Sequence, residues 1–192
     1  MGNLSWYVAR ASGIVAWALM AAGVLWGLAI STKSFRGRVK PNWMLDLHRF
    51  LGGAGVVLVG IHLAALVADN YISFGLLQLL VPFTSSYRAS AVAWGVAAMY
   101  ALLAVEVTSL LRNRLSKKAW RRTHALSFPL FAAATVHGLT AGTDSGSPLL
   151  RWAYIGVTAA VAGLTAVRVA GLLESKGPTL TNGHAARSSA HG

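Results

Sequence analysis

The sequence predicts an all-α integral membrane protein, a bundle of five transmembrane helices, and three observations support this. The chain is 55% hydrophobic. Only 11% of its residues are charged, whereas a soluble domain carries about 25%. Apolar runs of membrane length alternate with short polar loops along the chain. We expect residues 1–174 to form one membrane domain, because 192 residues leave no room for a second folded unit.

The five apolar runs each approach the ~20 residues that a helix needs to cross a bilayer. Helices are expected because every backbone polar group in lipid must be satisfied internally. The first run has no basic region before it and continues for about 25 residues, so it is a span rather than a cleavable signal peptide. The predicted spans are Trp6–Ile30, Leu47–Val67, Ala89–Leu111, Trp120–Ala141 and Leu149–Leu172.

The basic residues predict the orientation. Two loops, Ser31–Asp46 and Arg112–Arg122, carry four and six lysines or arginines, whereas Ala68–Ser90 and Gly142–Arg151 carry one each. The positive-inside rule places the two basic loops in the cytoplasm, the N-terminus outside and the C-terminus inside. We therefore expect a multi-pass protein of the plasma membrane, the inner membrane of a bacterium. The net charge of +12 then reports topology, and no nucleic-acid partner is expected.

Two smaller segments complete the chain. Tyr71–Phe83 is apolar but too short to cross, so it is predicted to lie in the outer interface as an amphipathic helix. Residues 175–192 are rich in Gly, Ser, Ala and Asn and are predicted to be a disordered cytoplasmic tail. His184 and His191 in this tail are interpreted as solvated.

The chain has no cysteine. Disulfides, iron–sulfur clusters, thiolate zinc sites and covalent C-x-x-C-H haem attachment are therefore excluded. Any metal must be held by histidine, methionine or oxygen.

Four histidines lie inside the predicted spans, and such residues in a bilayer are functional candidates. His48 and His62 are 14 residues apart, and His124 and His137 are 13 apart. Either spacing corresponds to roughly 20 Å along a helix. Because the second and fourth spans run in the same direction, the expected pairs are His48–His124 near the cytoplasm and His62–His137 near the outer face.

Two neutral imidazoles saturate a haem iron and favour electron transfer. The pairs therefore predict two haems, one above the other, in a setting of glycine and alanine that lets a flat macrocycle approach the backbone. Arginines suit the haem propionates because they bind carboxylates bidentately. The candidates are Arg49, Arg121 and Arg122 inside, and Arg10 and Arg88 outside.

The spacing of 13 residues leaves His124 and His137 about 140° apart on an ideal helix. Pro129 lies between them, and we expect it to kink the span and correct their facing. Glu106 is the only acid deep in a span; it is interpreted first as a partner of Arg168 and second as a proton relay.

At these residues the chain resembles the ferric-reductase-like transmembrane family, which includes ferric reductases, NADPH oxidases and the haem subunit of periplasmic methionine-sulfoxide reductase. The matching stretches are L-D-L-H-R-F-L-G-G to G-I-H-L-A-A-L (Leu45–Leu66) and R-R-T-H-A-L-S-F-P to T-V-H-G-L-T-A-G-T-D (Arg121–Asp144). The resemblance implies two b-type haems with His48, His62, His124 and His137 as axial metal ligands, in the haem subunit of an oxidoreductase.

Members of the family that reduce iron or oxygen by themselves continue into a flavin- and nicotinamide-binding domain, and no G-x-G-x-x-G follows here. We therefore expect a separate electron donor, a flavoprotein or a quinol, and an acceptor that the sequence does not identify. Two other classes stay open: a small metal-ion transporter that uses the paired histidines, and a scaffold that docks partners through its basic loops.

Overall fold

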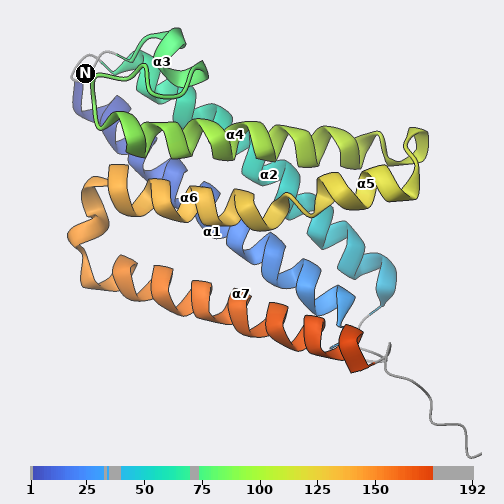
Figure 1. Cartoon of the computed structure of the whole chain (residues 1–192). Helices are drawn as coiled ribbons and strands as arrows, with labels where there is room; N and C mark the ends of the chain where they lie inside the picture. Colours follow the sequence, from blue (N-terminus) through green and yellow to red (C-terminus); the bar gives the residue numbers. More distant parts are fainter. Residues whose placement is uncertain (1, 33, 35–39, 70–73, 175–192) are drawn as a thin grey trace, which may run out of the picture.

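The structure is a computed structural model that describes residues 2–32, 34, 40–69 and 74–174 (Figure 1). The predicted tail 175–192, with His184 and His191, lies outside these residues. All regular elements of the described chain are helices. Its elements are α1 (Gly2–Ser31), α2 (Pro41–Ala68), α3 (Leu76–Leu80), α4 (Ala89–Leu110), η1 (Arg112–Arg114), α5 (Lys117–His124), α6 (Ser127–Ala141), η2 (Thr143–Gly146) and α7 (Pro148–Glu174).

Four of these helices are long and apolar enough to cross a membrane: α1, α2, α4 and α7. They match four of the predicted runs, which confirms the all-α membrane class. The second helix extends beyond the apolar run predicted at about Leu47–Val67, because α2 already begins at Pro41. Proline is favourable in the first turn of a helix, where its missing N–H would have had no partner.

The fourth predicted run, Trp120–Ala141, is not one continuous helix. It is divided into α5 and α6 by a tightened turn in which Leu126 N–H bonds to Thr123 O at 3.0 Å and Phe128 N–H to Ala125 O at 3.3 Å. Pro129 lacks an N–H, and its ring excludes an α-helical carbonyl four residues earlier, at Ala125. The expected kink between the two histidines is therefore present, but it lies just after His124 rather than at Pro129.

The long helices pack in neighbouring pairs. α1 runs along α2, α4 along α6, and α7 against α1 (Figure 1). Trp17, Phe131 and Tyr154 are buried together where α1, α6 and α7 meet. The Trp17 ring lies 4.2 Å from that of Tyr154, measured between centroids, and its N–H donates to Thr135 Oγ1 at 3.0 Å. This aromatic cluster fills the middle of the bundle.

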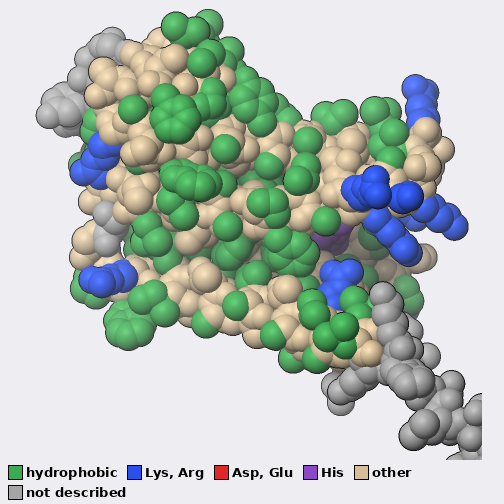
Figure 2. Space-filling model, in the orientation of Figure 1, with side chains coloured by type: hydrophobic (Ala, Val, Ile, Leu, Met, Phe, Trp, Pro, Cys, Tyr) green, Lys and Arg blue, Asp and Glu red, His purple; other side chains and the backbone are tan. Residues whose placement is uncertain are grey.

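The two ends of the bundle differ in charge. The end formed by the start of α2, by η1 and by α5, here called the basic end, gathers many lysines and arginines (Figure 2). The opposite end, formed by α3 and η2, is called the loop end. The predicted interfacial helix Tyr71–Phe83 is represented there by α3 alone, since 71–73 lie outside the described residues. Phe74 and Leu79 are buried beside α4, whereas Leu76 and Leu77 are exposed.

Candidate functional site

The four membrane histidines form two facing pairs between α2 and the α5–α6 segment. His48 and His124 face each other near the basic end, with ring centroids 5.9 Å apart and ring planes at 67°. His62 and His137 do so towards the loop end, at 6.4 Å and 82°. The predicted partners are thus brought together, and the turn between α5 and α6 overcomes the unfavourable spacing of 13 residues.

At the loop end, both rings are packed against a glycine of a neighbouring helix. A methyl group on Gly13 of α1 would stand 3.0 Å from His62 Nδ1, and one on Gly95 of α4 would stand 2.7 Å from His137 Nδ1. Ordinary carbon contacts are about 3.5–4.0 Å. No larger residue fits at these two positions without moving the imidazole, so the glycines allow the rings to approach the helix backbone.

The same close approach gives each loop-end histidine a main-chain hydrogen bond. Nδ1–H of His62 donates to Ala9 O at 2.7 Å, and Nδ1–H of His137 donates to Ala91 O at 2.8 Å. Each carbonyl lies one turn before the glycine on the same helix. A histidine whose Nδ1 is held this way presents Nε2 as its free metal-binding nitrogen.

The basic-end pair has a different environment. Gly27 of α1 lies against His48, where a methyl group would stand 3.2 Å from Cε1. His48 Nδ1 is buried and forms no hydrogen bond of good geometry in the part of the chain that the structure describes; the main chain of Gly23, one turn before Gly27, is the backbone group that it approaches. His124 Nδ1 lies 3.4 Å from the hydroxyl of Ser109, and its ring is stacked on Trp120 with centroids 5.0 Å apart.

A cavity of about 200 Å³ opens beside the loop-end pair. His62 and His137 line it together with their glycines, and apolar side chains of α1, α4 and α7 complete its wall. Polar groups of Arg10, Tyr87 and Asp144 lie at its loop-end edge. The lining of the cavity is therefore mostly apolar, with the Arg10–Asp144 ion pair as its charged part.

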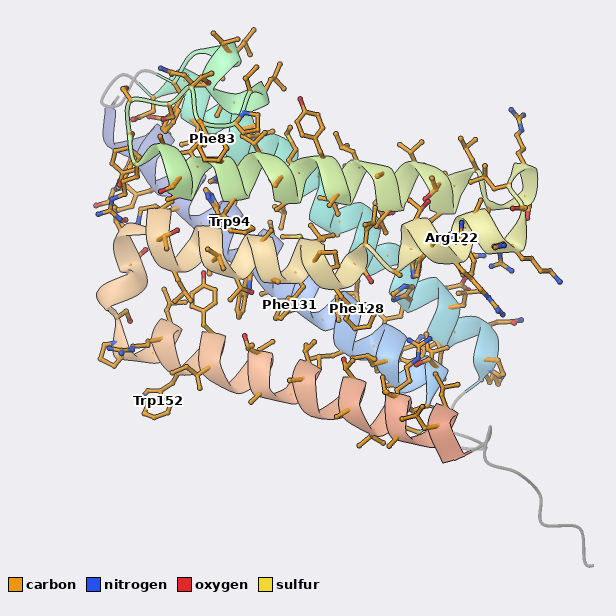
Figure 3. All side chains as sticks on the ribbon, viewed as in Figure 1. Phe83, Trp94, Arg122, Phe128, Phe131 and Trp152 are labelled. Atoms are coloured by element: carbon orange, nitrogen blue, oxygen red, sulfur yellow. The ribbon has the colours of Figure 1, made fainter. Side chains whose placement is uncertain are left out.

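The predicted propionate-binding arginines occupy different positions. Arg10 lines the cavity and is bound bidentately by Asp144, with Nε 2.9 Å from Oδ2. Arg49 is exposed and forms a 3.4 Å ion pair with Asp46. Arg121 and Arg122 are exposed on α5, where Figure 3 labels Arg122.

Two other arginines complete this comparison. Arg88 donates from its Nη1 to Thr140 O at 2.6 Å. Arg168, the expected partner of Glu106, is exposed. Among the described residues, Glu106 and Arg168 form no ion pair. The interpretation of Glu106 as a partner of Arg168 was therefore wrong. The Glu106 carboxyl lies instead directly against Gly52 of α2, in the space that a side chain at position 52 would fill.

The histidine pairs fit a bis-histidine haem. A metal–nitrogen bond of about 2 Å, with about 1.2 Å from the nitrogen to the ring centre, puts two axial imidazoles about 6.3 Å apart between centroids. The observed 5.9 and 6.4 Å agree with this separation. Among the described residues, no three His, Cys, Asp or Glu side chains are grouped to hold a bare metal ion.

The sequence analysis did not identify the residues of α1 and α4 that lie against the histidine rings. Gly13 and Gly27 are 14 residues apart on α1, and Gly95 and Ser109 are 14 apart on α4. These intervals equal the His48–His62 spacing because neighbouring helices that lie side by side have the same rise per residue. The signal was therefore present as a repeated interval of small residues, but small residues are common at every membrane helix interface.

The chain was compared with known protein families, curated proteins and solved structures. The family model described as "Ferric reductase like transmembrane component" matches residues 12–135. This range includes His48, His62 and His124 and ends just before His137. No curated protein and no solved structure matches the chain. Members of this family are membrane components of oxidoreductase systems and typically contain haem.

The match covers more than half of the 192 residues. It agrees with the multi-pass helical architecture and with the two motifs that carry the resemblance in the sequence. The chain belongs to the ferric reductase-like transmembrane component family.

Proposed function

We propose that this chain is a di-haem b-type cytochrome that carries electrons across a membrane as the haem subunit of a reductase system. The observation that carries the proposal is the presence of two facing histidine pairs, one towards each end of the bundle, at separations that suit axial ligation. His48 and His124 would hold one haem, and His62 and His137 the other. When bound, each haem would accept and release one electron at a time.

The chain's own residues prepare the ligands for this role. Carbonyls of Ala9 and Ala91 fix the orientation of His62 and His137, so that Nε2 of each ring is directed away from the bonded helix. Trp17 and Phe131, buried between the levels of the two pairs, exclude water from the middle of the bundle. A dry, rigid interior lowers the reorganisation that accompanies a change of charge at the ligands.

The proposed topology has five crossings, with the N-terminus outside and the C-terminus in the cytoplasm of a bacterial plasma membrane. In this arrangement α5 and α6 together form the fourth crossing, because their combined residues run from the basic end to the loop end (Figure 1). The clustered lysines and arginines of the basic end favour its cytoplasmic location. The exposed apolar side chains of the long helices then face lipid.

The electron donor lies outside this helical domain. The described residues contain only helices and short connections, with none of the βαβ units that form a doubly wound dinucleotide-binding fold. A flavoprotein or a quinol is the donor we propose, at either end of the bundle. The acceptor is a separate molecule that reaches the other haem level.

The arrangement does not favour the metal-ion transporter considered from the sequence. A bare transition-metal ion takes three or four protein ligands, whereas each level of this bundle offers two imidazoles. Haem supplies four nitrogens itself and requires only two axial ligands. The number of histidines per level therefore favours haem.

Purification in detergent, followed by oxidised and dithionite-reduced spectra and by haem quantification, tests the proposal. We expect two b-type haems per polypeptide with low-spin bands. If the protein contains no haem after expression with an adequate haem supply, the proposal is refuted and the metal-ion transporter becomes the leading hypothesis.

Alanine variants assign the sites. His48→Ala and His124→Ala should each remove the basic-end haem, and His62→Ala and His137→Ala the loop-end haem. Unchanged haem content in all four variants would disprove the ligand assignment. His→Ala variants that lose both haems would be checked for folding by circular dichroism before the result is interpreted.

A further inference from the structure

The groups on neighbouring helices that contact the four imidazoles differ between the two ends of the bundle. Both loop-end rings donate Nδ1–H to a main-chain carbonyl through a gap left by a glycine. At the basic end, His124 instead meets a side-chain hydroxyl, that of Ser109, at 3.4 Å.

Ser109 occupies on α4 the position that corresponds to Gly95. The two residues are 14 apart on the same helix, and they contact the two histidines of the α5–α6 segment. Next to Gly95, the carbonyl of Ala91, one turn earlier, accepts from His137. Next to Ser109, the corresponding carbonyl belongs to Val105. The Thr108 hydroxyl lies 3.2 Å from that carbonyl, whereas His124 Nδ1 faces the Ser109 hydroxyl.

The identity of the acceptor at Nδ1 affects the metal-bound nitrogen of the same ring. An imidazole that donates a strong hydrogen bond from Nδ1 becomes a more basic ligand at Nε2. A more basic axial ligand stabilises the more positive, oxidised iron and lowers the reduction potential. A hydroxyl at 3.4 Å is a longer and weaker acceptor than a carbonyl at 2.8 Å.

We propose that Ser109 is a positioning residue for His124: its hydroxyl replaces the main-chain carbonyl used at the other site and sets the reduction potential of the basic-end haem. This inference rests on the proposed function. It predicts opposite effects for two substitutions. Removing the hydroxyl by Ser109→Ala leaves Nδ1 without an acceptor and raises the potential. Ser109→Gly opens the path to the Val105 carbonyl and lowers it.

Thr108 provides a matched control on the same turn of α4. Its hydroxyl donates to Ala104 O at 2.7 Å and also lies 3.2 Å from Val105 O, both in its own helix. Within the described residues it forms no hydrogen bond to a histidine. Thr108→Val removes this hydroxyl at nearly constant volume. It therefore reproduces the loss of a helix hydroxyl near His124 without changing the group that faces the imidazole.

The experiment is a potentiometric titration of the purified di-haem protein, followed in the visible spectrum, with low-spin electron paramagnetic resonance of the oxidised form. The component that is lost in His124→Ala identifies the basic-end haem. In Ser109→Ala we expect its one-electron equilibrium to move about threefold towards reduction, about 30 mV at 59 mV per tenfold, with the loop-end component unchanged. Ser109→Gly should shift the same component in the opposite direction.

Three results would overturn the proposal. In the first, Ser109→Ala has the same two potentials and resonance signals as Thr108→Val. In the second, the loop-end component shifts instead. In the third, Ser109→Gly raises the potential as much as Ser109→Ala, which would show that no carbonyl takes over from the hydroxyl. Failure of the proposed function is distinguishable, because the unsubstituted protein would then lack two haem components.

Discussion

Replacing Gly95 by alanine is expected to weaken the loop-end haem site selectively. The new methyl group would stand 2.7 Å from both Cε1 and Nδ1 of His137. To reach an ordinary contact of about 3.5–4.0 Å, the ring must move away by about 1 Å. Its hydrogen bond to Ala91 O, now 2.8 Å, would lengthen to about 3.8 Å and be lost.

The size of the effect follows from these two losses. Overpacking costs about 1–3 kcal/mol, and a lost hydrogen bond about 1 kcal/mol. Together they amount to about 2–4 kcal/mol, which corresponds to about 30- to 1,000-fold weaker haem binding at this site. The basic-end haem should be unaffected, because neither His48 nor His124 contacts Gly95.

The assay is haem per polypeptide and the rate of haem transfer to apomyoglobin. Gly60→Ala is the matched control: it lies on α2 near His62, and a methyl group there would meet nothing within 4 Å. Gly13→Ala, with a closest approach of 3.0 Å to His62, should have a smaller effect than Gly95→Ala. Wild-type haem content and transfer rate in Gly95→Ala would refute the argument that the glycine receives the ring.

Gly52→Ala should overpack the contact between α2 and α4, because its methyl group would collide with the Glu106 carboxyl. Overpacking lowers the free energy of unfolding by about 1–3 kcal/mol, and the thermal unfolding temperature should fall accordingly. Glu106→Ala in the same chain should restore that temperature, and no restoration would disprove the contact. In Trp17→Phe, the loss of the buried hydrogen bond to Thr135 should lower the free energy of unfolding by about 1 kcal/mol. A double-mutant cycle with Thr135→Val measures this coupling, and a coupling of zero would contradict it.

The membrane class and the histidine pattern could be predicted from the sequence because they depend on local properties. Long apolar runs define helices in a bilayer whatever their neighbours are. The interval between His48 and His62 fixes their separation along α2, since helix rise is constant. The partners of each pair followed from the direction of the helices, which alternates from one crossing to the next.

The helix breaks and the contacts between helices could be decided only by the tertiary structure. The turn at Ala125–Leu126 rotates α6 relative to α5, and Pro129 alone did not locate it. Arg10 was expected to be available as a cation, yet Asp144, 134 residues later, is bound to it. Glu106 faces Gly52 rather than Arg168.

Each of these features depends on how far a helix is rotated about its axis and how closely it approaches its neighbour. Apolar composition leaves both quantities open, because lipid and protein interior are almost equally favourable surroundings for a leucine. The sequence by itself therefore determined the number of histidines at each level and their spacing along the helices. The tertiary structure decided which glycine, carbonyl or hydroxyl each imidazole meets, because that contact is made between helices far apart in the chain.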